Sequence, residues 1–228
     1  MRLAVAAIII VAIYIVAAGS VSTTLSSGDL QAIGMLRGVE TCRDRLTFDA
    51  EIRCLRVVQA AVLAIAPGRA CAAKGVRIEP LDFVRRGYGC CFDRARFIEK
   101  ALSHYGFSTR RVAMYERRRG WIGFLIPGID SHAASEVRTR RGWLAVDSEQ
   151  PFMLITRGGR PLQFDELHTV DPRTLYTRPT RSHSFGFENA YFVVRGLYSR
   201  HGQSHGVRLP APEINYPDFL RYAVFGRD

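Results

Sequence analysis

The sequence predicts an α+β fold, because helical and strand patterns occupy different parts of the chain. Residues 48–65 and 91–105 both repeat apolar side chains with the spacing of an amphipathic helix. From residue 110 onward the pattern changes to short apolar runs separated by glycine, proline and polar residues, which is typical of strands. Helices followed by strands, without regular alternation, indicate a helical layer packed on an antiparallel sheet.

The first residues carry a signal for export. Residues 3–18 form an uninterrupted apolar run behind Arg2. At ~1.5 Å per residue the run reaches roughly 24 Å, which is short for a bilayer core of about 30 Å. We therefore expect residues 1–20 to be a cleaved signal peptide or a short membrane anchor. The rest of the chain should lie outside the cytoplasm, in the periplasm or an equivalent compartment.

The 228 residues have room for one folded domain behind this segment. Residues 21–38 are mostly small and polar and contain glycine, so we expect a linker. Residues 39–228 are then expected to form the domain, with a C-terminal extension.

The net charge of the chain indicates the chemistry of its binding partners. The formal net charge is +11 and rests on arginine, since Lys74 and Lys100 are the only lysines. An anionic membrane surface or an acidic polysaccharide would fit this charge, although most of the arginines also fit ordinary solvated faces. The sequence contains no phosphate-binding glycine loop and no nucleic-acid motif, so we expect no nucleic-acid partner.

Five cysteines make an odd number for an exported chain, which leaves one thiol unpaired if the others are bridged. Proximity in sequence favours the pairs Cys42–Cys54 and Cys71–Cys90, with Cys91 free. Buried free cysteines that pack as small apolar residues are the alternative.

The helices have clear limits in the sequence. Pro67 and Gly68 end the first one, and residues 68–88 are expected to form a loop or a short helix. Gly106 ends the second helix, whose polar side chains largely take the face opposite the apolar one. Cys91 falls on its first turn, where unpaired backbone N–H groups and the helix dipole favour a thiolate over a thiol.

A hairpin is the clearest feature of the strand region. Residues 131–139 and 142–146 are two strand patterns joined by a tight turn. His132 lies near the start of the first and Asp147 follows the end of the second. Because the first residues of one strand face the last residues of the next in an antiparallel hairpin, we expect these two side chains to be partners.

Other strands and loops are less regular. We expect strands at 110–115, 121–126, 152–156 and 190–194, an extended surface segment at 197–218 and a short helix at 219–225.

In order, the chain offers a thiol at a helix N-terminus, a histidine on a strand and a carboxylate after the neighbouring strand. A histidine can share the thiol proton, and a carboxylate can orient the imidazole and stabilise its cation. Such a set attacks acyl carbons and forms a thioester, which water or an amine then resolves.

These residues and their neighbours resemble the transglutaminase-like superfamily, which has a papain-like fold. The resemblance spans roughly residues 87–151, about a quarter of the chain, and its blocks agree in order. Residues 91–95 are similar to Cys-x-Asp-x-Ala, 105–112 to Leu-Gly-Ile-Pro-Ala-Arg-x-Val, 132–137 to His-Ala-Trp-x-Glu-Val, and 142–148 to Gly-Trp-x-x-x-Asp-Pro/Ser-Thr. It implies a papain-like core, with the nucleophile at the N-terminus of a central helix, and a triad of Cys91, His132 and Asp147.

The chain also departs from this pattern. Ser108 replaces a proline, Ala134 replaces a tryptophan, and Cys90 adds a second thiol. The family register selects Cys91 over Cys90, because only Cys91 places the aspartate, the alanine and the later glycine correctly. Glu136 resembles the family's strand glutamate and is expected to be structural, paired with Arg110.

The remaining candidates are an oxyanion donor and a metal site. The backbone N–H of Cys91 can supply one oxyanion donor. Tyr88 is a side-chain candidate, and Trp121 a further one, although both also fit as packing aromatics. His183, His201 and His205 are spaced through a glycine-containing loop that would not align metal ligands, so we expect neither a metal nor another cofactor.

The sequence therefore predicts an exported, cysteine-dependent acyl-transfer enzyme that hydrolyses amide or peptide bonds in a protein or peptide substrate. Two alternatives stay open. The thioester could be passed to an amine, as in a protein-glutamine transglutaminase. The fold could also serve as a non-catalytic binding module for acidic envelope polymers or a partner protein.

Overall fold

The computed structural model describes residues 5, 8–13, 20–43, 46–67, 70–72, 78–117, 130–177, 179, 185–198 and 213–226. Its helices are α2 (Ser27–Ile33), α3 (Phe48–Ile65), α4 (Pro80–Arg86), α5 (Cys91–His104) and α6 (Tyr216–Asp218), with a 3₁₀ turn η1 (Val39–Arg43) and a π-helical turn η5 (Phe219–Val224). Its strands are β1 (Ser108–Glu116), β2 (Ser131–Thr139), β3 (Gly142–Val146) and β4 (Tyr191–Arg195). The expected α+β class is confirmed.

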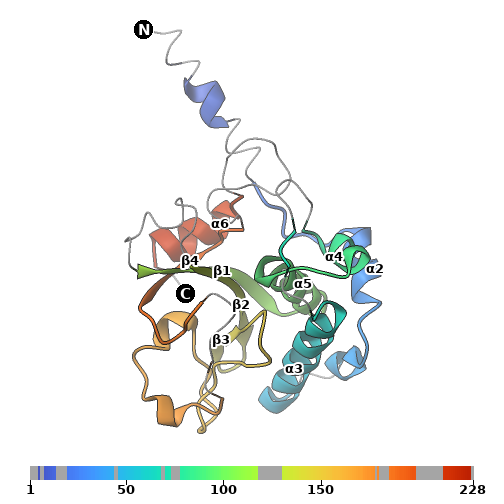
Figure 1. The fold of residues 1–228 in the computed structure, drawn as a ribbon, viewed down its shortest axis with the longest axis vertical. Coiled ribbons are helices and arrows are strands. Elements are labelled where there is room, and N and C mark those ends of the chain that lie inside the picture. Colours follow the sequence, from blue (N-terminus) through green and yellow to red (C-terminus); the bar gives the residue numbers. More distant parts are fainter. Residues whose placement is uncertain are drawn as a thin grey trace.

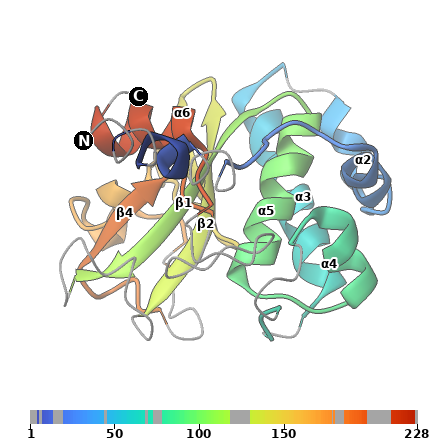
Figure 2. The ribbon, with the colours of Figure 1, turned by 90° about the horizontal axis from the view of Figure 1, so that it is seen from above.

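The molecule has a helical layer beside a four-stranded antiparallel sheet (Figures 1 and 2). The strand order is β3-β2-β1-β4. Helix α5 packs directly on β1 and β2, and α3 and α4 pack against α5. The N-terminus of α5 therefore meets the sheet near the beginning of β2, and this junction holds the candidate site.

Several predicted elements are confirmed. Helix α3 has the predicted limits, and β2 and β3 form the predicted hairpin, in which Thr139 pairs with Gly142. Residues 152–156 form isolated bridges rather than the expected continuous strand. The strand expected at 121–126 and most of the extended segment expected at 197–218 lie outside the described residues.

The linker predicted at 21–38 is wrong, because α2 lies within it and belongs to the folded domain. Ala32 and Ile33 are buried in the core that also contains α3, and Asp29 accepts an ion pair from Lys100 Nζ at 2.6 Å. Ser26 and Asp29 form a capping box that starts the helix. The small, polar composition of this segment concealed a short helix that α4 and α5 cover, and the domain begins before residue 39.

The polar face of α5 is also buried, whereas the sequence pattern placed it opposite the core. Arg96 and Lys100 are 1% and 4% exposed. Glu79 contacts both of them, at 3.0 Å from Arg96 Nη2 and 2.7 Å from Lys100 Nζ. Residues 91–102 of α5 are thus enclosed on all sides, and the polar face is buried through ion pairs with segments distant in sequence.

None of the helices among the described residues is both long and apolar enough to span a bilayer.

Candidate active site

The turn that carries Cys91 is fixed by its neighbours. Gly87 ends α4 with a φ of +67°, a left-handed conformation that favours glycine. Gly89 has no room for a side chain, because a Cβ there would lie 2.6 Å from Phe83 Cε2 and 2.8 Å from Asp93 Cβ. The two glycines therefore allow the chain to enter α5 against Phe83 and Asp93.

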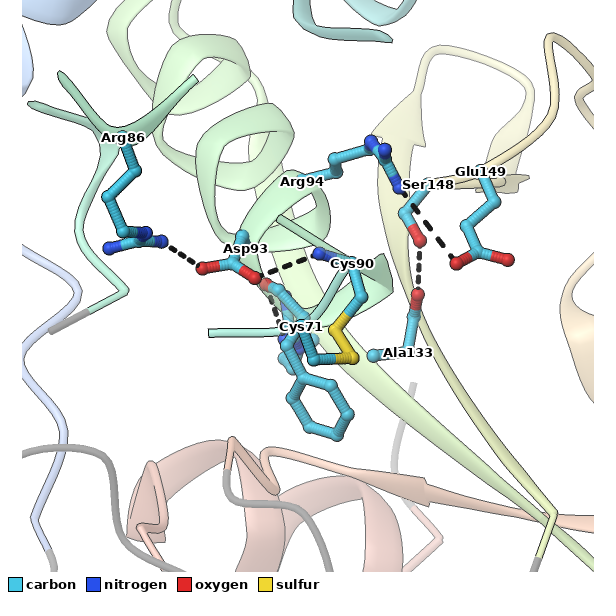
Figure 3. The surroundings of a disulfide bond; sticks show 10 residues. Cys71, Arg86, Cys90, Asp93, Arg94, Ala133, Ser148 and Glu149 are labelled. Carbon is cyan, nitrogen blue, oxygen red and sulfur yellow. Dashed lines mark hydrogen bonds and ion pairs between the residues drawn. A yellow bond between two sulfur atoms is a disulfide. The ribbon is translucent and has the colours of Figure 1, made fainter. Parts of the chain in front are cut away.

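Asp93 locks this turn from the third position of α5. Its carboxylate accepts a hydrogen bond from Cys90 N at 3.0 Å. It also forms an ion pair with Arg86, whose Nη2 lies 2.5 Å away (Figure 3). Burial raises the pKa of Asp93, although the Cys90 hydrogen bond and the charges of Arg86 and Arg111 oppose the rise. The aspartate of the Cys-x-Asp pattern thus acts as a helix cap that positions the thiol-bearing residue.

The cysteines pair as the sequence favoured. Disulfides join Cys42 to Cys54 and Cys71 to Cys90, and Cys91 is the free cysteine. Cys90 is the N-cap residue of α5, so the second disulfide ties residues 70–72 to the start of the helix (Figure 3). Cys91, the first residue of α5, is 6% exposed.

His132 and Asp147 are partners, though not through the backbone pairing that the hairpin pattern suggested. The last ladder pair of β2 and β3 is Ser135 with Val146, so both residues lie beyond it. Their side chains meet past the end of the ladder, with His132 Nε2 2.5 Å from Asp147 Oδ1. Both are buried, at 2% and 0% exposure.

The loop after β3 holds Asp147 rigidly. Ser148 N donates to Asp147 Oδ1 at 2.7 Å, and Gln150 N donates to Oδ2 at 3.1 Å. From α3, Gln59 Nε2 donates to three carbonyl oxygens of this loop, those of Asp147, Gln150 and Phe152, at 2.8–3.0 Å. The sequence analysis missed Gln59, whose signal was a single amide next to the apolar positions of the predicted helix.

The charges around His132 favour its protonated form. Burial lowers the pKa of His132, but the charge and hydrogen bond of Asp147, together with a hydrogen bond and charge from Cys91, raise it well above its usual range. Because Nε2 contacts Asp147, Nδ1 is the ring nitrogen left for the thiol. Phe185 and Phe187 pack on the ring at centroid distances of 5.8 and 5.5 Å and restrict its orientation.

Polar contacts between α5 and the sheet set the position of Cys91 relative to His132. Ser135 Oγ donates to Ala95 O at 3.2 Å and Ser148 Oγ donates to Ala133 O at 2.5 Å. Arg94 on α5 forms an ion pair at 3.9 Å with Glu149, in the loop that follows Asp147 (Figure 3). Helix, strand and loop are therefore connected around the three site residues.

Arg111 is a second residue that the sequence analysis missed. It lies on β1, is fully buried, and donates from Nη2 to Phe92 O at 2.9 Å. Its Nε and Nη1 have no hydrogen-bond partner among the described residues. Burial lowers the pKa of Arg111, and the charges of neighbours that include Cys91 raise it in part. A buried arginine therefore lies under the first turn of α5, beside the residue that follows Cys91.

The remaining candidates from the sequence are two aromatic residues and three histidines. Tyr88 is 43% exposed, and the Arg86 guanidinium lies 5.8 Å from its ring centroid, so its role in an oxyanion site stays a prediction. Trp121, His183, His201 and His205 lie outside the described residues. Within the part of the chain that the structure describes, no group of three or more His, Cys, Asp or Glu residues could hold a metal ion.

Comparison with protein-family models, with curated proteins and with solved structures returned no match to this chain. The family therefore stays a proposal, which the motifs and the geometry of the site have to support.

Proposed function

We propose that this protein is a cysteine-dependent acyl-transfer enzyme of the transglutaminase-like superfamily, with a papain-like core. One observation carries the proposal. A free cysteine at the N-terminus of a central helix lies beside a histidine that is hydrogen-bonded to a buried aspartate. The apolar N-terminal segment and the two disulfides support an exported protein that acts in the periplasm or a similar compartment.

In this proposal Cys91 is the nucleophile and His132 is the acid and base. The Cys91 thiolate attacks the acyl carbon, and the resulting tetrahedral oxyanion accepts a hydrogen bond from the backbone N–H of Cys91. The His132 imidazolium then donates its proton to the leaving amine, and the C–N bond breaks to give a thioester. Asp147 keeps the ring oriented and stabilises its positive charge.

Water then resolves the thioester. His132, now neutral, takes a proton from water and the hydroxide adds to the thioester carbon. The C–S bond then breaks to release a carboxylic acid and the Cys91 thiolate, which restores the thiolate–imidazolium pair. Hydrolysis needs no separate site for an amine acceptor, so we propose a peptidase or amidase that acts on a protein or peptide. Transfer to an amine would make the same site a transglutaminase.

One observation favours the alternative of a binding module. Cys91, His132 and Asp147 are 6%, 2% and 0% exposed, so all three side chains are buried. A papain-like scaffold at the cell surface that binds an acidic polymer or a protein would retain the same packing without turnover.

Alkylation of the unreduced protein separates these possibilities. At about pH 6 an ordinary thiol, with a pKa of roughly 8.5, is protonated and reacts slowly. A thiolate–imidazolium pair should make native Cys91 react with iodoacetamide at least about tenfold faster than the same thiol in urea-unfolded, unreduced protein. Cys91→Ala should lose all labelling. The matched double variant Cys71→Ala/Cys90→Ala, in which Cys91 is again the free cysteine, should keep fast labelling.

Slow labelling in the native protein, or labelling that survives Cys91→Ala, would remove the proposed nucleophile and favour the binding module. Incubation with a glutamine-containing peptide library and an amine probe then distinguishes the two reactions by mass. Cleaved or deamidated peptides indicate hydrolysis, and peptides that gain the probe indicate a transglutaminase.

A further inference from the structure

An apolar patch lies at the C-terminal helix, far along the chain from the candidate site. It consists of Leu220, Val224 and Phe225, which are 45%, 55% and 64% exposed, and we call it the C-terminal patch. Arg221, beside it on η5, is exposed as well. Two large apolar side chains on one short helical turn and a third on the residue that follows it, next to a cation, are typical of a contact surface rather than of a solvated helix.

The helix that carries the C-terminal patch is held firmly on the sheet. Phe219 packs against a cluster formed by Tyr115 and other residues of β1 and β4, and the Tyr222 ring lies 6.0 Å from Trp143. Gly196 has a φ of +78°, and a Cβ there would lie 2.6 Å from Phe219 N. Close packing fixes the inner face of the helix, so the C-terminal patch is held outward on a rigid support.

The N-terminal apolar segment leaves the domain beside this helix. Ser20 forms a parallel bridge with Ile214, and Val21 N donates to Ile214 O at 3.1 Å. Residues 8–13 are helical, and their large apolar side chains are 51–69% exposed. Figure 1 shows this short helix outside the body of the domain, and Figure 2, seen from above, shows it over the half of the molecule that holds α6 and β4. The base of the apolar segment therefore lies next to the residues that lead into α6 and η5, which carry the C-terminal patch.

We propose that the C-terminal patch docks on the surface of an anionic lipid bilayer, the same bilayer that residues 3–18 enter. Leu220, Val224 and Phe225 would enter the interface between headgroups and acyl chains, and Arg221 would contact lipid phosphates. A net charge of +11 favours an anionic surface. The N-terminal segment holds the patch near the bilayer, so weak contacts are sufficient.

A second copy of the chain fits the patch less well. A stable dimer buries about 800 Å² on each partner, from roughly 20–30 residues. The C-terminal patch offers three large apolar side chains. A bilayer, by contrast, needs only an apolar ridge with a cation, provided that a second element supplies the main affinity.

A tryptophan reporter in the full chain tests this inference. Val224→Trp is placed in the C-terminal patch, and Tyr176→Trp is the matched control. Tyr176 is 63% exposed and its ring centroid lies 5.5 Å from the guanidinium of Arg56 on α3, whereas η5 packs on β4 and on Trp143 of β3. Both variants are mixed with vesicles of phosphatidylcholine and phosphatidylglycerol, and the emission of the parent chain is subtracted. Lipids with brominated acyl chains then report contact with the bilayer.

We expect the Val224→Trp emission to shift to the blue and to be quenched by brominated lipid, while Tyr176→Trp emission stays solvent-like. Adding Arg221→Glu, or replacing the anionic lipid with phosphatidylcholine, should reduce the quenching. Solvent-like emission at position 224 in protein that floats with the vesicles would overturn the inference. A blue shift of the same size in lipid-free protein, rising with protein concentration, would also overturn it and indicate a dimer.

The inference rests on the proposed export and anchoring, and not on the chemistry of Cys91. If the full chain does not float with the vesicles, both the anchoring and the docking fail. If native Cys91 is unreactive but the reporter is quenched, the enzymatic proposal fails alone.

Discussion

Two buried ion pairs each have one partner on β2, and these two partners lie four residues apart on the same face of the strand. The pairs differ in the side chain that carries the positive charge. His132 contacts Asp147, and Glu136 contacts Arg110 at 2.7 Å and Arg195 at 3.0 Å. Both carboxylates are fully buried. Glu136 also accepts from Phe164 N at 3.0 Å. Burial and charge pairing are therefore common to both, and neither feature identifies a reactive site.

The difference lies in the cation. A guanidinium stays protonated at all ordinary pH values and can only hold a structure together. An imidazole can release its proton, and His132 has a second ring nitrogen next to the free thiol of Cys91. The comparison teaches that a buried pair becomes a candidate for catalysis when one partner can exchange a proton with a nucleophile.

Asp147→Asn should have the largest effect on chemistry. Loss of the carboxylate charge leaves burial as the main influence on His132, so its pKa should fall and the imidazolium should be lost near neutral pH. Loss of this partner in other triads reduces kcat by about 10⁴, and we expect a decrease of about 10³–10⁴ in turnover. The alkaline limb of the pH–rate profile of turnover, in which the His132 imidazolium is the proton donor, should move to lower pH. An unchanged profile would contradict the assigned role of Asp147.

The same variant tests the stability of the pair. Because the folded pKa of His132 lies above its unfolded value of about 6.5, the stabilisation is fully present below about pH 6.5 and is lost as pH rises through the folded value. Thermal unfolding of parent and variant should therefore differ most at acidic pH. Asp165→Asn is the control, since the Asp165 side chain is 49% exposed and contacts Arg195 instead.

Glu136→Gln should give the opposite result, a loss of stability without a specific loss of reactivity. Removing its charge leaves Arg110 and Arg195 with less compensation in a buried setting, and breaking such a pair typically costs about 3–5 kcal/mol. Urea unfolding measures this loss. In the folded fraction, the rate of Cys91 alkylation at about pH 6 should match that of the parent. A slow alkylation rate in folded protein would mean that the Glu136 ion pairs also influence the His132–Asp147 pair.

Arg111→Gln should have a smaller effect on the thiol. It removes the buried positive charge under the first turn of α5, which would stabilise negative charge on the reacting sulfur, so alkylation at about pH 6 should slow by about tenfold. Arg111→Lys keeps the charge and should recover part of the rate. If Arg111→Gln lowers stability but leaves the pH profile of alkylation unchanged, Arg111 is structural, like Arg110.

Asp218→Asn should have the smallest effect. It tests whether a shifted pKa is by itself evidence of a functional site. Burial and the charge of Glu99 raise the pKa of Asp218 to about 6, against the opposing charges of Arg221 and Arg110. The fold therefore loses stability as pH rises from about 4 to about 6, and the loss remains above that range. After solvent screening, Asp218→Asn should gain about 1 kcal/mol at neutral pH and little at pH 4. Cys91 alkylation should not change.

Local sequence patterns were sufficient to predict the helix and the hairpin that carry the candidate site. The apolar period defined α3 with its limits, and the turn at Arg140 and Arg141 defined the β2–β3 hairpin. Both signals depend on neighbours within a few residues, which sequence displays directly. The expectation that His132 and Asp147 are partners followed from the hairpin alone, although their contact is made by side chains beyond the ladder.

The errors concern polar residues whose environment is set by distant segments. The small, polar composition of residues 21–38 predicts a linker, but α2 lies within this segment and is covered when α4 and α5 pack beside it. Gln59 was unremarked because its three acceptors lie in a loop about ninety residues away. Arg110 and Arg111 are adjacent in sequence and equally buried, yet one contacts Glu136 and the other lies under Cys91's helical turn.

The sequence by itself determined the α+β class, the limits of the main helix and hairpin, and the choice of Cys91, His132 and Asp147 as the residues to compare. Only the tertiary structure decided which charged side chains are buried and which partner each one meets. The physical reason is that apolar periodicity is a local property, readable over a few turns or strand residues. The environment of a buried charge is set by segments that meet only when the chain has folded.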